Sequence, residues 1–243
     1  MKKDKKNTEI KKSNEKVVLK IDNVNYRYAD AKKDEYVLRD INFEFETGKI
    51  YAIKGKSGSG KTTLLSLISG LENKYEGNIY YKDKELKKTN LDNYRSNDIG
   101  IVFQSYNLLP HLNAIENIIL SMDVSKVKVK DKKGKAIELM ESVGLDKSLG
   151  KRRVLRLSGG EQQRVAIARS LSYNPDLILA DEPTGNLDKD TENDIINIFK
   201  DLAHKDNKCV IIVTHSQNVC DQVDVVYELK KTLKLEWTPF WTL

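Results

Sequence analysis

The sequence predicts an α/β fold built around a mostly parallel β-sheet. Strand-sized apolar runs alternate with helical segments along most of the 243 residues, which is typical of parallel strands connected by helices. The runs at 177–180 and 209–213 are apolar throughout, as in strands that are buried on both faces of a sheet. An amphipathic helix is predicted between them, at 191–204.

The remaining elements follow from local patterns. Short runs rich in Val, Ile, Tyr and Phe predict strands at 17–21, 24–28, 37–45, 49–54, 77–81 and 99–103. Helices are predicted at 61–71 and 161–172. Between 112 and 150 the pattern becomes helical and interrupts the alternation. We therefore predict an inserted helical subdomain at about 105–160.

Positive charge is concentrated at the N-terminus. The formal net charge is +6, but residues 1–16 hold seven lysines against three acidic residues. We predict a basic, disordered tail there, because this segment has almost nothing to bury. The rest of the chain is close to neutral, unlike proteins that bind nucleic-acid backbones, so no nucleic-acid partner is expected.

The sequence contains no apolar run near the roughly 20 residues that a membrane-spanning helix needs. The N-terminus also lacks the apolar stretch of a secretion signal. We therefore expect a cytoplasmic location.

A phosphate-binding loop is predicted at 55–62, between a strand and a helix. Its sequence, GKSGSGKT, has two glycines flanking four residues, followed by Lys and Thr. Glycines allow backbone N–H groups to close around phosphate oxygens. Lys61 is expected to reach the β- and γ-phosphates, and the Thr62 hydroxyl to bind Mg²⁺. The predicted contacts are Gly55, Lys56, Ser57, Gly58, Ser59, Gly60, Lys61, Thr62 and Thr63.

Two carboxylates follow the buried strand at 177–180. Ligands of open α/β sheets bind at the carboxyl ends of the strands, which is where Asp181 and Glu182 lie. Asp181 is expected to hold Mg²⁺ through water. Glu182 is suited to polarise an attacking water molecule. Alone, the pair would be ordinary surface carboxylates; together with the phosphate loop, it predicts a hydrolytic site.

Six ordered elements resemble the ATPase subunit of an ATP-binding cassette (ABC) transporter, over about residues 17–229. Two are the phosphate loop and the Asp181–Glu182 pair. The others are Gln104, the signature LSGGEQQR at 157–164, Asp188 and His215. Glu161 of the signature stands where many members have Gln. The resemblance implies a P-loop NTPase core, an N-terminal antiparallel β subdomain, and hydrolysis of ATP with Mg²⁺.

The resemblance also implies a role for each residue. Catalysis is expected from Glu182, His215, Gln104 and Lys61, and Mg²⁺ binding from Thr62, Gln104 and Asp181. Adenine is expected to stack on Tyr28. Tyr26, two residues away on the same predicted strand face, is the alternative.

A second phosphate-binding element is predicted at residues 158–160, where a helix begins, since helix N-termini attract anions. The phosphate loop already holds one γ-phosphate, so a second site makes sense if it closes on the nucleotide of another copy. The family forms such a dimer around two ATP molecules. Across it, contacts are expected from Ser158, Gly159, Gly160, Glu161 and Asp188. The simpler alternative is that Ser158 is an ordinary helix cap.

Within the family, segments 104–110 and 182–188 resemble the macrolide-export, lipoprotein-release and peptide-antibiotic-resistance branch. This implies a homodimer bound to a separately encoded membrane permease at the inner face of the cell membrane. The alternative is an ABC-superfamily ATPase that acts on nucleic acid or the ribosome. Such relatives usually carry a long inserted coiled coil or two cassettes in one chain, and neither is predicted here.

Residues 230–243 depart from the family pattern. They lack the glycine turn that usually ends the last hairpin. Whether 233–237 pairs with 223–229 is left open by the sequence.

Overall fold

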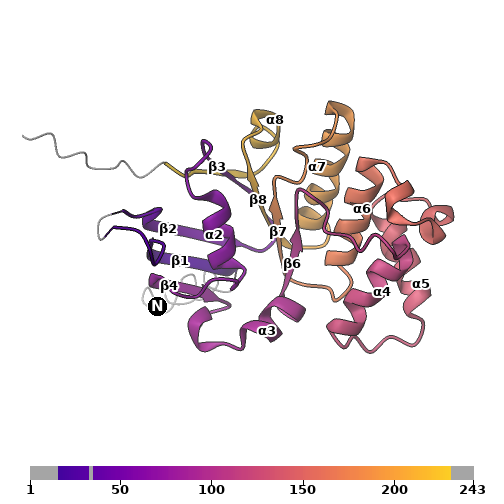
Figure 1. Ribbon diagram of the computed structural model, residues 1–243, viewed down its shortest axis with the longest axis horizontal. Helices are drawn as coiled ribbons and strands as arrows, with labels where there is room; N and C mark the ends of the chain where they lie inside the picture. The colour runs from indigo at the N-terminus through magenta and orange to yellow at the C-terminus, as the bar shows by residue number, and fades with distance from the viewer. Residues whose placement is uncertain (1–15, 33–34, 231–243) are drawn as a thin grey trace, which may run out of the picture.

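The computed structural model describes residues 16–32 and 35–230, and a five-stranded sheet lies at their centre (Figure 1). Its strands are β3 (Ile50–Lys54), β6 (Ile99–Val102), β7 (Leu177–Asp181), β8 (Cys209–Thr214) and β9 (Val225–Glu228). They are ordered β6-β7-β8-β3-β9, and each neighbouring pair is parallel. This confirms the predicted parallel core.

A second, antiparallel sheet is formed by the N-terminal part of the chain, as predicted. Its strands are β1 (Val17–Tyr26), β2 (Leu38–Glu46), β4 (Glu76–Tyr81) and β5 (Lys84–Glu85), in the order β2-β1-β4-β5. The two runs expected at 17–21 and 24–28 are one strand that ends at Tyr26. Its register is irregular between Ile21 and Val24, where Asn23 has a left-handed φ of 50°. This irregularity breaks the alternation that would have revealed a single strand.

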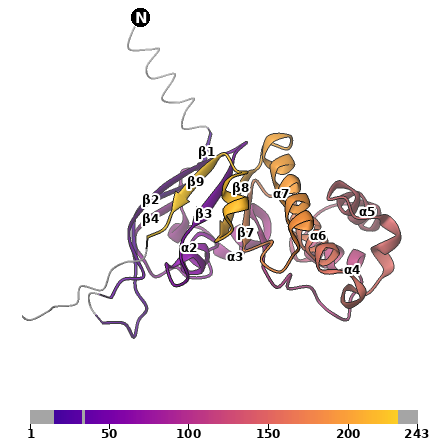
Figure 2. The ribbon, with the colours of Figure 1, turned by 90° about the horizontal axis from the view of Figure 1, so that it is seen from above.

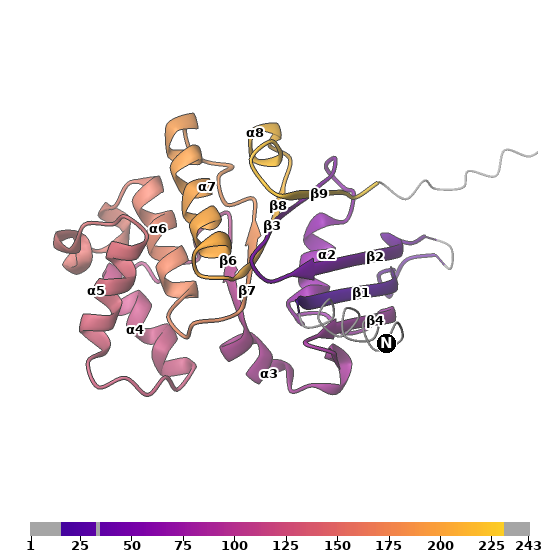
Figure 3. The ribbon, with the colours of Figure 1, turned by 180° about the vertical axis from the view of Figure 1, so that it is seen from behind.

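Helix α2 (Lys61–Ile68) packs between the two sheets, and the helices between residues 114 and 220 lie on the far side of the parallel sheet (Figures 2 and 3). Successive residues of a strand point to opposite faces, so each buried strand serves two cores. Leu179 faces the core that contains α2, whereas Ile178 faces the core formed with the helices. Both side chains are fully buried.

The helical layer includes the predicted helical block. The helices of the whole layer are α4 (Ala114–Val124), α5 (Lys132–Ser142), α6 (Gly159–Ser170), α7 (Lys189–His204) and the short α8 (Gln217–Cys220), with 3₁₀ turns η3 (Lys147–Lys151) and η4 (Val154–Arg156). Helices α4, α5 and α6 contact one another pairwise. The predicted limits of this subdomain stay a prediction.

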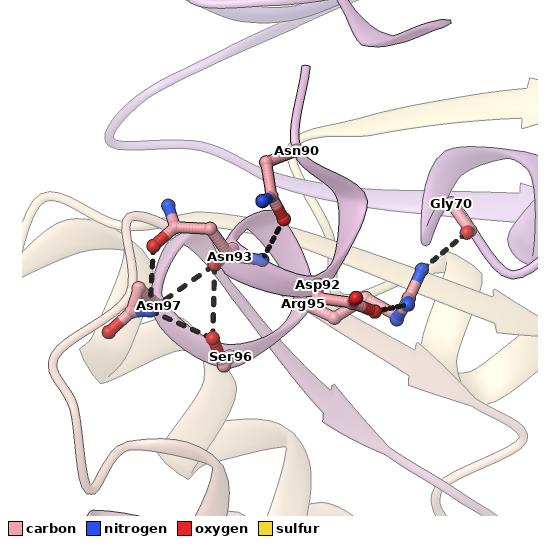
Figure 4. A network of polar contacts seen from close by, with 7 residues as sticks. All are labelled: Gly70, Asn90, Asp92, Asn93, Arg95, Ser96 and Asn97. Atoms are coloured by element: carbon pink, nitrogen blue, oxygen red, sulfur yellow. Dashed lines mark hydrogen bonds and ion pairs between the residues drawn. The ribbon is translucent and has the colours of Figure 1, made fainter. Parts of the chain in front are cut away.

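The connection from β5 to β6 was not predicted from the sequence. It consists of η1 (Leu86–Lys88), α3 (Leu91–Asn93) and η2 (Tyr94–Asp98). The Asn90 side chain caps α3 by accepting from the Asn93 amide at 2.9 Å (Figure 4). The Arg95 guanidinium pairs with Asp92 and donates to the Gly70 carbonyl at 2.7 Å. This contact fixes the connection to the turn after α2.

Residues 1–15 and 231–243 lie outside the described part of the chain, and with them most of the predicted basic tail and the strand considered at 233–237. Within the described ranges, no helix is both long enough and apolar enough to cross a bilayer.

Candidate functional site

The register of the parallel sheet brings the predicted site residues to one edge. Lys54 at the end of β3 is level with Thr214 of β8, and Asp181 at the end of β7 is level with Val213. The segments that follow these strands therefore leave the sheet side by side. They carry the phosphate loop, Glu182 and His215.

These segments enclose a cleft of about 780 Å³. It is lined by Tyr28, Val37, Ser57, Gly58, Gly60, Lys61, Thr62, Thr63, Gln104, Asp181, Glu182 and His215. One cavity thus brings together the predicted metal and catalytic residues and most of the predicted phosphate contacts, whereas Gly55, Lys56 and Ser59 do not line it. Val37 is a wall residue that the sequence analysis did not identify.

The phosphate loop has the backbone that its glycines predict. Gly58 and Gly60 have left-handed φ angles of 76° and 91°. A side chain on Gly55 would place its Cβ 2.3 Å from the Ser59 hydroxyl oxygen and 2.8 Å from the Leu229 carbonyl. Lys61 Nζ donates to the Gly55 carbonyl at 2.8 Å, so the lysine folds over the loop.

The N-terminus of α2 is open to a ligand. Among the α-helices of the described residues, α2 alone has no side chain that caps its first turn. The first amides of a helix have no intrahelical acceptor, and they attract anions together with the helix dipole. In the described part of the chain, the buried Ser59 hydroxyl also has no hydrogen-bond partner. This arrangement fits the phosphates of a nucleotide.

The two carboxylates occupy different environments. Burial raises the pKa of Asp181 above its ordinary value, Glu182 adds to the rise, and the Lys61 cation opposes it. Glu182 has a left-handed φ of 46°, which is uncommon for a residue with a side chain. Its amide still donates to the Val213 carbonyl at 2.9 Å. The chain therefore turns sharply at Glu182, and the strain lies at the site itself.

His215 and Glu182 are in direct contact across the ends of neighbouring strands. His215 Nδ1 lies 2.6 Å from Glu182 Oε2. The histidine side chain is 69% exposed, whereas that of the glutamate is 16% exposed. The pair therefore joins a sheltered carboxylate to an imidazole on the open side of the cleft.

The segment that starts at Gln104 is fixed by contacts that the sequence did not predict. A Cβ on Gly185 would lie 2.9 Å from Gln104 Nε2, so the glycine permits this close approach. Tyr106 and Asn107 are both left-handed, with φ of 62° and 50°. Arg169 of α6 donates to the Tyr106 carbonyl at 2.9 Å and also to that of Asn107. The segment from Gln104 to Asn107 thus approaches the loop after β7 at one end and is bound to α6 at the other.

The oxygen donors of Thr62, Gln104 and Asp181 fit Mg²⁺. Magnesium is usually bound through one or two carboxylates and the phosphates of its substrate, with water completing the shell. Residues 16–32 and 35–230 contain no group of three or more His, Cys, Asp or Glu that could hold a metal unaided. At a site formed by Thr62, Gln104 and Asp181, a nucleotide and water would supply the remaining ligands.

Tyr26 and Tyr28 differ in position. They do not share a strand face, because β1 ends at Tyr26. Tyr26 is 6% exposed and belongs to the core, whereas Tyr28 is 50% exposed and lines the cleft. The Tyr28 hydroxyl lies 3.1 Å from the Thr63 hydroxyl. The geometry therefore favours Tyr28 for adenine.

The signature and Asp188 form a separate cluster. They do not line the cleft of their own chain. Ser158 caps α6: its hydroxyl accepts from the Glu161 amide at 3.3 Å, and its amide donates to the Glu161 carboxylate at 2.7 Å. Ser158 and Glu161 thus form a capping box at the start of α6. The capping box does not use the amides of Gly159 and Gly160. It is therefore compatible with both predicted uses of Ser158, as a cap and as an anion contact.

Asp188 lies beside this helix start. It caps α7 by accepting from the amide and the hydroxyl of Thr191 at 3.0 and 2.7 Å, and these bonds lower its pKa. A Cβ on Gly160 would lie 2.6 Å from Thr191 Cγ2. The cluster is thus tightly packed.

Phosphate loop, carboxylate pair and parallel sheet together define a P-loop nucleoside triphosphatase. The chain belongs to the ABC transporter family, whose family model matches residues 38–185. It is an ATP-binding and ATP-hydrolysing subunit of this family. Members of the family hydrolyse ATP with Mg²⁺.

Similar proteins cover nearly the whole chain. The ABC transporter ATP-binding protein YclH of Bacillus subtilis is 44% identical over 214 residues, which are 88% of this chain and 94% of YclH. The lipoprotein-releasing system ATP-binding protein LolD of Francisella tularensis is 38% identical, covering 88% of this chain and 94% of LolD. The ATP-binding cassette MJ0796, a dimer with ADP and Pi bound in a post-hydrolysis state, is 34% identical with a TM-score of 0.79, covering 88% and 96%.

Proposed function

We propose that two copies of this chain close around two ATP molecules and drive a separately encoded membrane permease. The observation that carries the proposal is the separation of two elements within one chain. The cleft holds the open N-terminus of α2 with Glu182 and His215, whereas the signature lies outside it. The dimeric state of the MJ0796 cassette supports the same arrangement.

Each residue of the cleft has a role in this proposal. Lys61 and the first amides of α2 bind the β- and γ-phosphates, and Tyr28 stacks on adenine. Thr62, Gln104 and Asp181 hold Mg²⁺, which supplies charge neutralisation for the transferred phosphoryl group. Glu182 takes a proton from the attacking water, and His215 orients this carboxylate.

The second copy contributes the signature. Ser158 and the amides of Gly159 and Gly160 approach the γ-phosphate held by the partner, with Glu161 keeping Ser158 in place. Asp188 lies at the same contact. ATP then acts as part of the interface, and hydrolysis reopens it.

We place the dimer at the cytoplasmic face of the cell membrane, bound to its permease. The likeness to LolD supports a permease of the lipoprotein-release type. The exported or released substrate is in this view lipid-linked or amphipathic.

The Glu182→Gln variant tests the proposal. It keeps the shape of the side chain but removes the base, so hydrolysis falls by about 10²- to 10⁴-fold. ATP is then retained in a stable dimer, detectable by size-exclusion chromatography with MgATP. A variant that binds ATP but stays monomeric contradicts the proposal.

A further inference from the structure

Glu192, in the first turn of α7, connects the loops that follow two neighbouring strands. Its carboxylate accepts from the Thr184 hydroxyl at 3.1 Å and from the Ser216 hydroxyl at 2.9 Å, both at Oε1. Asn218 Nδ2 donates to Oε2 at 3.2 Å. Thr184 belongs to the loop after β7, and the other two residues to the segment after β8. One side chain thus joins the ends of both strands.

These loops carry the catalytic pair. Thr184 lies two residues after Glu182, and Ser216 follows His215 directly. The separation of 2.6 Å between the carboxylate and the imidazole therefore depends on how the two loops sit relative to each other. Thr184 is 5% exposed, so its hydroxyl is fixed within packed surroundings.

We infer that Glu192 is a positioning residue, which sets the geometry of Glu182 and His215 through Thr184 and Ser216. The inference rests on the proposed function, in which Glu182 is the base. Nothing in the sequence motifs assigns a role to this position. Its half-buried carboxylate acts on the loops rather than on the nucleotide.

The chemistry of the three partners suits an ionised carboxylate. A carboxylate only accepts hydrogen bonds, and all three partners present donors. Hydrogen bonds to a charged acceptor are also shorter and stronger than neutral ones. The Ser216 hydroxyl additionally accepts from the Val219 amide at 3.4 Å, so its proton is left for Glu192.

A second row of contacts holds the Asn218 side of the network. Asn193 Oδ1 accepts from Asn218 Nδ2 and from Gln222 Nε2, both at 3.0 Å. Lys200 Nζ donates to Gln222 Oε1 at 3.2 Å. These contacts hold helices α7 and α8 side by side and so fix the position of Glu192.

The test compares Glu192→Ala and Glu192→Gln with Asp201→Asn. Asp201 lies on the same helix, is exposed, and its substitution removes the same charge. We expect kcat to fall by about 10- to 100-fold in Glu192→Ala, because small displacements of reacting groups have effects of this size. In Glu192→Gln, which keeps the shape but presents an amide donor to other donors, we expect kcat to fall by about 3- to 10-fold.

The KM for MgATP and the Kd for nucleotide stay within about twofold in both variants, because the phosphate loop is untouched. Asp201→Asn resembles the wild type in kcat. A merely structural role predicts instead that kcat, nucleotide affinity and Tm fall together. An unchanged kcat in folded Glu192→Ala, or a parallel loss of nucleotide affinity, overturns the inference.

A double-mutant comparison tests the route of the effect. In a chain that already carries Thr184→Val and Ser216→Ala, Glu192→Ala is expected to lower kcat by less than about twofold further. A full additional loss shows that Glu192 does not act through these hydroxyls. If Glu192→Ala does not fold, Glu192→Gln and Ser216→Ala decide the matter, with a kcat unchanged in both overturning the inference.

Glu182→Gln is measured in the same assays, so that a failure of the proposed function can be distinguished from a failure of the role of Glu192. Hydrolysis that persists in Glu182→Gln overturns the proposed function. Loss of hydrolysis in Glu182→Gln together with a normal kcat in Glu192→Ala overturns only the role of Glu192.

Discussion

His215 Nδ1 lies 2.6 Å from Glu182 Oε2, at the ends of two adjacent parallel strands. The glutamate adopts a left-handed backbone at this point, so strain and contact coincide. A strained residue persists only when its surroundings determine it, and such residues cluster at functional sites. The contact indicates that the histidine controls where the carboxylate points.

His215→Ala should lower kcat by about 10²- to 10³-fold, because the base loses its orienting partner and the transition state loses a donor. Nucleotide Kd is expected to change by less than about threefold. Steady-state ATPase assays and nucleotide titrations measure the two quantities. A wild-type kcat in this variant would show that the contact between His215 and Glu182 has no part in hydrolysis.

Asp181→Asn should raise the Tm of the nucleotide-free protein while abolishing Mg²⁺-dependent hydrolysis. The raised pKa of Asp181 means that its ionised form is disfavoured by the fold. This cost is absent below the ordinary pKa of a carboxyl and fully present above the raised one. The difference in Tm between variant and wild type should therefore grow as the pH rises through that range. A variant that is less stable than the wild type at neutral pH contradicts this explanation.

Tyr28→Ala should weaken ATP binding by about 5- to 10-fold, as expected for the loss of one aromatic stacking contact worth about 1 kcal/mol. Tyr28→Phe keeps the ring and loses the hydroxyl contact to Thr63. It should bind ATP within about twofold of the wild type. Equal weakening in both variants would mean that the hydroxyl, not the ring, contributes to affinity.

The parts of the site that follow regular geometry were predictable from the sequence. The phosphate loop is local, since its glycines and lysine lie within eight residues. Asp181 and Glu182 were also recognisable, because they lie at the end of an apolar strand, and parallel strands bring their carboxyl ends to one edge. His215 was identified only through the resemblance to the family.

Contacts between distant residues were not predictable. The Arg169 clamp on Tyr106 and Asn107 joins positions 62 and 63 residues apart. The approach of Gln104 to Gly185 and the bonds from Ser216 and Asn218 to Glu192 depend likewise on how separate elements pack. No periodicity in the sequence signals such pairs.

Tyr26 and Tyr28 show the limit of strand patterns. Alternation placed both residues on one face, but the strand ends between them. One ring is therefore buried, and the other reaches the cleft. The strand boundary lies two residues earlier than predicted, and this difference separates the two candidates, with Tyr28, the first choice, at the cleft.

The central claim is that each ATP is held by two copies of the chain. The most direct test measures the ATPase rate per molecule during dilution, with the oligomeric state determined in the same samples. We predict that the rate per molecule falls as dimers disappear, and that Ser158→Arg, which binds ATP normally, is inactive at all concentrations. A rate per molecule that stays constant down to concentrations where only monomers are present contradicts the account.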